Sequence, residues 1–155
     1  DGECWKWTDQ SIAFSPAGAP LLRSKSAVFR RLSFNFDRVF HPHHRTSELY
    51  RSVLRSAVVL PAARGIHGSV LAYGQTSTGK TYTMQGTPQH PGVIPLAVSD
   101  VFDHIASTRG REFLLRISYL EVYNESVNDL LDPQGTNLRL LEDPKTGCVI
   151  RGLRE

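Results

Sequence analysis

Cysteine is scarce in this chain, which argues against a disulfide-stabilised scaffold. Only Cys4 and Cys148 occur among the 155 residues, and their separation matches neither a metal-binding nor a disulfide motif. Two isolated cysteines are typical of reduced thiols in an intracellular protein. The sequence also lacks any apolar run near the ~20 residues that cross a bilayer, and no segment resembles a signal peptide. We therefore expect no membrane partner.

An excess of either charge is also missing. The chain carries 18 Lys and Arg residues and 15 Asp and Glu residues, for a net charge of +3. A balance this mild permits an acidic partner without requiring one, and we expect no nucleic-acid partner. The chain begins with Asp1 rather than Met, so we expect a fragment, a processed product or a trimmed gene model.

Histidine is concentrated at His41, His43 and His44. No cluster of carboxylates or cysteines accompanies these imidazoles, and Pro42 between them indicates a turn. The sequence therefore disfavours a metal site at this segment.

Residues 74–81 match the phosphate-binding pattern G-x-x-x-x-G-K-[ST]. Its glycines let several backbone N–H groups face one anion, and the following helix adds its positive end. Lys80 supplies a charge for the β- and γ-phosphates, and the Thr81 hydroxyl is placed to bind Mg²⁺. A chance match is expected in roughly one chain in 300 of this length. The predicted phosphate loop comprises Gly74, Gln75, Thr76, Ser77, Thr78, Gly79, Lys80 and Thr81.

The pattern carries this meaning only between a strand and a helix. Residues 69–73 form a short apolar run after Gly65 and Gly68, which predicts a buried strand. A helix is predicted to open at about Gly79. Glycine and proline predict a loop over 85–92.

Apolar periodicity predicts the remaining strands. Residues 1–14 are loosely strand-like, 15–27 read as a loop, and alternation over 32–36 indicates a strand. The run 113–123 is apolar on both faces and predicts a buried strand inside a sheet. A hairpin is predicted from 138–141 and 148–153.

Two further helices are predicted from capping signals and apolar stripes. One begins with Thr46 or Ser47 as its cap, and Pro61 should end or kink it. The other has Pro95 in its first turn and ends at Gly110. Strands thus alternate with helices, so the predicted fold class is α/β with helices flanking a sheet.

Five segments together resemble the kinesin motor domain. Residues 72–84 read AYGQTSTGKTYTM, close to the family's AYGQTxSGKT-[HY]-TM, with Thr78 where serine is common. Similar motifs occur in the family's order at 34–40, 92–95, 118–125 and 129–132. The sequences of residues 110–119 and 137–143 most resemble those of the kinesin-7 group, which includes centromere protein E. The resemblance extends from about Phe34 to Glu155.

The resemblance implies an incomplete motor domain with a P-loop NTPase-type central sheet flanked by helices, spanning residues 1–155. It implies ATP and Mg²⁺ as ligands, with Lys80 as the catalytic residue and Thr81 on the metal. Tyr82 occupies a position whose ring lies against adenine in the family, and simple packing on its helix is the alternative. Glu121 and Asn124 are expected to satisfy buried polar contacts.

The same resemblance implies partners and a location for the longer parent. Its partner is the microtubule, and it forms a homodimer through a coiled coil outside these residues. Its expected location is the microtubule cytoskeleton in the cytoplasm, and the kinetochore is a second expected location.

Three departures from the family pattern affect the expected activity. An R-x-R-P strand before residue 5 and two switch motifs after residue 155 are absent, so we expect this chain alone to hydrolyse little or no ATP. The alternative is a truncated, non-enzymatic fragment that binds nucleotide or a partner. Another P-loop enzyme such as a nucleotide kinase is disfavoured, because a partner carboxylate and an arginine-rich lid are missing. Pro61 and one extra residue between Tyr50 and Gly68 interrupt a helix that is continuous in the family.

Overall fold

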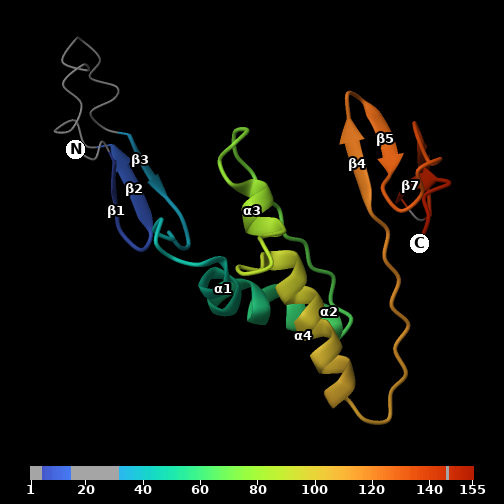
Figure 1. The fold of residues 1–155 in the computed structure, drawn as a ribbon, viewed down its shortest axis with the longest axis horizontal. Coiled ribbons are helices and arrows are strands. Elements are labelled where there is room, and N and C mark those ends of the chain that lie inside the picture. The colour runs from blue at the N-terminus through green and yellow to red at the C-terminus, as the bar shows by residue number, and fades with distance from the viewer. Residues whose placement is uncertain (1–4, 15–31, 146) are drawn as a thin grey trace. The chain divides into compact units, whose positions relative to one another are not determined.

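The computed structural model describes residues 5–14, 32–145 and 147–155, and it divides into two compact units (Figure 1). One unit extends to Arg109 and the other begins at Gly110. The loop predicted over 15–27 lies outside the described residues. Each unit is described by itself below.

A small antiparallel sheet opens the first unit. Its strands are β1 (Trp5–Trp7), β2 (Ser11–Phe14) and β3 (Ser33–Asn35), in the order β1-β2-β3. The edge of the Trp5 ring packs on Phe14, with centroids 5.3 Å apart. The strand predicted at 32–36 is therefore confirmed in a shorter form, and the strand-like residues near the N-terminus form a hairpin.

The first predicted helix is continuous and consists of an α-helical, a π-helical and a second α-helical segment. It runs through α1 (Thr46–Leu49), the π-helical η4 (Tyr50–Val59) and α2 (Leu60–Ala63). The prediction that Thr46 or Ser47 caps this helix is wrong, because the cap is Arg45, whose backbone is extended. The Arg45 N–H donates to the Glu48 carboxylate at 2.8 Å, so Glu48 satisfies a backbone donor at the helix start.

Pro61 neither ends nor breaks the helix at its own position. It is the second residue of α2, it follows helical residues without a break, and the helix continues to Ala63. The ten residues before α2 are π-helical, and a π-helical turn takes up more residues than an α-helical one.

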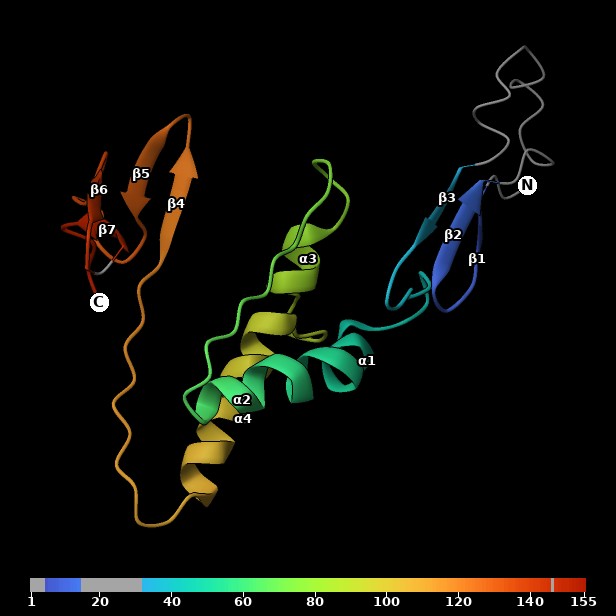
Figure 2. The same cartoon turned by 180° about the vertical axis from the view of Figure 1, so that it is seen from behind.

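Two further helices pack beside this one. Helix α3 (Lys80–Met84) begins after Gly79, as predicted, and α4 (Val93–Ser107) has Pro95 in its first turn. Helix α4 ends three residues before the predicted Gly110. Both η4 and α2 contact α4 (Figure 2). Among the described residues the buried apolar side chains are Tyr50, Val59 and Val93.

A polar link joins η4 to α4 at this core. The Tyr50 hydroxyl donates to Asp100 Oδ2 at 2.6 Å. Arg55 Nε donates to both oxygens of the same carboxylate, at 3.1 and 3.0 Å. The buried ring of Tyr50 therefore ends in a charge-assisted hydrogen bond.

The loop between α3 and α4 is closed by its own backbone, which confirms the loop predicted there. Gly86 and Pro91 form an isolated bridge, and the Gly92 N–H donates to Gln85 O at 3.1 Å. The N–H groups of Thr87 and His90 donate to each other's carbonyls, at 2.8 and 3.1 Å.

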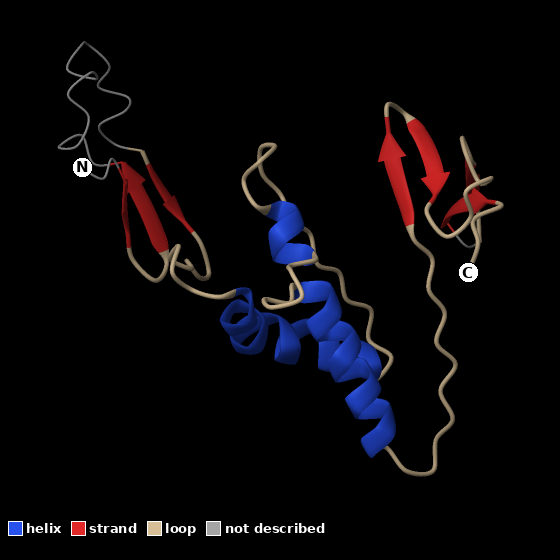
Figure 3. Cartoon of the chain, viewed as in Figure 1, coloured by secondary structure: helices blue, strands red, loops and turns tan. Residues whose placement is uncertain are grey.

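Two predicted strands are wrong in whole or in part. Residues 69–73 are extended but belong to no strand, and Leu71 and Tyr73 are 91% and 101% exposed. Of the run 113–123, only Leu120–Tyr123 is a strand (β4), and the rest is an exposed extended segment (Figure 3). Apolar runs indicate a tendency to be buried, but a strand also needs a neighbour for its N–H and C=O groups. Within the described residues no strand pairs with either segment.

Two hairpins contain the strands that the structure describes in the second unit. Strand β4 pairs with β5 (Ser126–Asp129) through a two-residue turn in which Asn124 and Glu125 both have positive φ. Strand β6 (Arg139–Asp143) pairs with β7 (Gly147–Arg151), which confirms the second predicted hairpin. Glu121 and Asn124 are exposed, so the expectation that they satisfy buried contacts is wrong.

Asp129 is the buried polar residue of this unit, at 5% exposure. Its carboxylate accepts the N–H of Leu131 and the N–H of Arg154, each at 2.8 Å. One side chain thus holds together the ends of two separate segments.

Candidate phosphate-binding site

Residues 74–79 form a tight loop between the extended segment 66–73 and α3. Gly79 and Ser77 have left-handed backbones, with φ of +94° and +66°. At Gly74 a Cβ would lie 2.8 Å from Thr78 Oγ1, so the loop can close only around a residue without a side chain. Gly79 is thus required for its backbone conformation, whereas Gly74 is required both for its positive φ of +155° and for the close approach of Thr78.

Hydrogen bonds within the loop fix this conformation. The hydroxyl and the N–H of Thr78 both donate to Gln75 O, at 2.7 and 3.4 Å. Lys80 Nζ donates to Gly74 O at 2.8 Å and to Gln75 O at 2.7 Å. The ammonium group therefore lies against the loop that the pattern defines, and within the described residues it has no ion pair with a carboxylate.

Several donors of the loop remain available. The N–H groups of Ser77 and Gly79 donate to no backbone oxygen that the structure describes. Lys80 and Thr81 occupy the first turn of α3, where N–H groups have no acceptor inside the helix. A fixed ammonium group, free N–H donors and a glycine-lined turn suit a polyphosphate.

The loop offers few side chains that could bind a metal ion. Thr81 is exposed at the start of α3, so its hydroxyl is accessible. No group of three or more potential metal-ligating side chains is found in the described part of the chain. Mg²⁺ commonly uses one or two protein ligands together with phosphate oxygens and water. The residues present therefore fit a magnesium ion that a bound phosphate helps to hold.

Tyr82, the ninth predicted site residue, is 50% exposed and lines two separate clefts. The first has a volume of about 380 Å³ and includes Thr78 and Gly79 of the loop. Its opposite wall is the turn before α1. This turn contributes Phe40, His41, Pro42 and His44.

That turn is the part of the site that the sequence did not indicate. The rings of His43 and His44 stack with centroids 4.8 Å apart, and the His41 N–H donates to His44 Nδ1 at 2.9 Å. These contacts stabilise the turn. Only the turn-forming Pro42 signalled an ordered segment, and nothing local linked it to residues 74–81.

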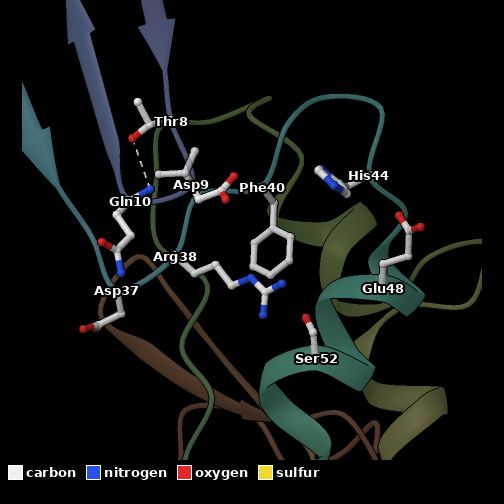
Figure 4. Close-up of a pocket in the computed structure, with 10 residues that line it drawn as sticks. Thr8, Asp9, Gln10, Asp37, Arg38, Phe40, His44, Glu48 and Ser52 are labelled. Atoms are coloured by element: carbon white, nitrogen blue, oxygen red, sulfur yellow. Dashed lines mark hydrogen bonds between the residues drawn. The ribbon is translucent and has the colours of Figure 1, made fainter.

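A larger cleft of about 840 Å³ lies between the turn after β1 and the helix formed by α1 and η4 (Figure 4). Asp9, Asp37 and Glu48 line it together with Arg38, whose guanidinium lies 5.3 Å from the Phe40 ring centroid. None of residues 74–81 lines this cleft. Its carboxylates disfavour a polyphosphate, so size alone does not identify the site.

No helix among the described residues is long and apolar enough to cross a bilayer.

A protein-family model described as the kinesin motor domain matches residues 18–155. The chain is 49% identical over 144 residues to kinesin-like protein KIN-7D, mitochondrial, of Arabidopsis thaliana, covering 93% of the chain and 13% of that protein. It is also 49% identical over 146 residues to kinesin-like protein KIN-7G of Oryza sativa subsp. japonica, covering 94% and 16%. The chain thus spans less than a fifth of the length of either relative.

Among solved structures, one of a fast kinesin is similar, with a TM-score of 0.82 and 35% sequence identity. The match covers 97% of this chain and 41% of the kinesin chain.

Proposed function

Because this chain belongs to the kinesin motor family, we propose that residues 74–81 bind the phosphates of ATP within a microtubule motor. The observation that carries the proposal is Lys80, whose ammonium group is fixed on two loop carbonyls beside unpartnered N–H donors. The whole motor activity belongs to the longer protein, and these residues supply its phosphate-binding part.

Each residue of the loop has a proposed role. Lys80 neutralises charge on the β- and γ-phosphates, and the N–H groups of the loop and of the first turn of α3 hold the remaining phosphate oxygens. The Thr81 hydroxyl is a ligand of Mg²⁺, which, when bound, screens the charge of the phosphates. The Tyr82 ring forms one side of the adenine site, at the cleft it shares with Thr78 and Gly79.

We further propose that this chain alone binds nucleotide with little turnover. Phosphoryl transfer requires groups that position the attacking water and stabilise charge together. Among the described residues, no carboxylate lines the 380 Å³ cleft beside the loop. In the longer protein, the microtubule is the partner, the microtubule cytoskeleton is the location, and a coiled coil forms the dimer.

The test is nucleotide binding by Lys80→Ala, measured with a fluorescent ADP analogue and Mg²⁺. We expect affinity to fall by about 10- to 100-fold, because a charge-assisted contact to phosphate is lost. Lys145→Ala is the matched control, since Lys145 is an exposed lysine in the β6–β7 turn. Phosphate release from ATP in the same samples should stay near background with and without microtubules. Equal affinities of the two variants would exclude the role proposed for Lys80.

A further inference from the structure

The second cleft that Tyr82 lines is basic. It has a volume of about 320 Å³ and lies between the start of the α1–η4 helix and the loop 85–92. Arg45, Arg51 and His90 line it, and no Asp or Glu does. None of residues 74–81 lines it, although it shares Arg45, Thr46 and Tyr82 with the 380 Å³ cleft beside the phosphate loop.

The positive charge of this cleft is not neutralised by nearby carboxylates. Within the described residues neither Arg45 nor Arg51 forms an ion pair. Glu48 is engaged by the backbone N–H of Arg45 and lines the cleft of Figure 4 instead. Asp100 is bound by Tyr50 and Arg55, and Arg51 is only a minor influence on it. The guanidinium groups of Arg45 and Arg51 are thus available to bind an anionic ligand.

The other walls of the cleft suit a compact anion. The hydroxyl-bearing residues Thr46 and Ser47 add donors, and the Tyr82 ring and Leu96 add an apolar side. His90 is held in place because its N–H donates to the carbonyl and to the hydroxyl of Thr87, both at 3.1 Å. The volume suits a single phosphate group with a small substituent rather than a folded segment.

We propose that this cleft is a second anion site, which binds inorganic phosphate or a small phosphate monoester through Arg45 and Arg51. Guanidinium groups pair with phosphate oxygens through parallel N–H donors, which makes two arginines without a carboxylate a phosphate-selective pair. The site goes beyond the proposed nucleotide function, since it requires neither Lys80 nor the phosphate loop.

Calorimetric titration of the 155-residue chain with inorganic phosphate, on a Lys80→Ala background, tests this site. That background weakens the phosphate loop, so retained binding belongs elsewhere. We expect Arg45→Gln or Arg51→Gln to reduce phosphate affinity at least tenfold. Arg64→Gln, an exposed arginine at the end of the same helix that does not line the cleft, should leave affinity unchanged.

A titration followed by amide NMR tests the site without any substitution in the cleft. Phosphate should shift the amide signals of residues 45–51 and of Gln89 and His90, and sodium chloride at equal ionic strength should not. If phenyl phosphate binds more tightly than inorganic phosphate, the preferred ligand is a phosphate monoester whose ring packs on Tyr82. If inorganic phosphate binds more tightly, the preferred ligand is the free ion. The proposal is overturned if Lys80→Ala abolishes phosphate binding, if the cleft variants match Arg64→Gln, or if chloride reproduces the shifts.

Discussion

We expect the hydrogen bond between Tyr50 and Asp100 to contribute substantially to the stability of the first unit. Tyr50 is 2% exposed, and its hydroxyl donates to Asp100 Oδ2 at 2.6 Å. Tyr50→Phe keeps the ring and removes this charge-assisted bond, which stabilises by about 1.5–3 kcal/mol. Asp100 keeps its bond to Arg55, so we expect a loss near the lower limit, about 1.5 kcal/mol. For a chain of this length that loss lowers the thermal midpoint by about 3–6 °C.

The measurement is thermal unfolding followed by circular dichroism, with urea unfolding to obtain the free energy. Tyr73→Phe is the matched control, because the Tyr73 side chain is fully exposed and its hydroxyl can be lost without effect. Asp100→Ala removes the acceptor of both Tyr50 and Arg55, so Tyr50→Phe should cost much less on that background. Additive losses, or a Tyr50→Phe variant as stable as Tyr73→Phe, would refute the reasoning.

The same contact makes stability depend on pH. The hydrogen bond from Tyr50, followed by the contacts with Arg55, holds the pKa of Asp100 below its ordinary value. Its contribution is therefore complete above the unfolded-state pKa of about 3.9 and is lost as pH falls through the lower folded value. Desolvation, followed by the bond to Asp100, raises the pKa of Tyr50, so its contribution declines as pH rises beyond about 10. The difference between the unmodified chain and Tyr50→Phe should shrink at both limits.

Two further predictions concern the loop 85–92 and the second unit. Gly86→Ala should destabilise by about 1–3 kcal/mol and expose the loop to limited proteolysis, because a Cβ would clash with Gly92 N and His90 O. Gly65→Ala, also at positive φ but with open space around it, is the control; an equal loss in both variants would rule out the clash. Asp129→Ala should abolish hydrogen-exchange protection of the Leu131 and Arg154 amides, whereas Asp132→Ala should not. The N–H of Arg154 is the main cause that lowers the pKa of Asp129, so this unit should lose stability as pH falls below about 4, and a flat acid profile would contradict that role.

The parts of the structure that sequence could predict are those decided within a few residues. The bonds that shape the phosphate loop join Gly74 or Gln75 to Thr78 and Lys80, six positions apart at most. The starts of α3 and α4 depend on Gly79 and Pro95 at the helix boundaries, and the β6–β7 turn depends on glycine at its end. Each of these features has its cause in the local chain.

The parts that sequence could not predict depend on distant partners. Residues 69–73 and 113–119 have strand-like composition, but neither segment pairs with a strand among the described residues. Whether such a segment pairs depends on residues far away in the sequence, which a local pattern does not reveal. The turn at His41 reaches Thr78 across 37 positions, and only the folded chain brings them to one cleft. The π-helical winding of η4 is likewise not indicated by its apolar periodicity, which predicts an ordinary helix.

The two proposed anion sites also differ in whether contacts between near or distant positions in the sequence shape them. The phosphate loop is shaped by its own backbone and by Lys80, so its geometry depends little on the small core around Tyr50 and Val93. The basic cleft instead needs Arg51 on η4, Tyr82 on α3 and His90 on the loop 85–92 to keep their places. Tyr50 and Asp100 join η4 to α4, so weakening that contact loosens one wall of the cleft against another. The proposed phosphate binding at Arg45 and Arg51 should therefore depend on the packing of the helices, whereas the proposed binding of a polyphosphate by residues 74–81 should depend mainly on local sequence.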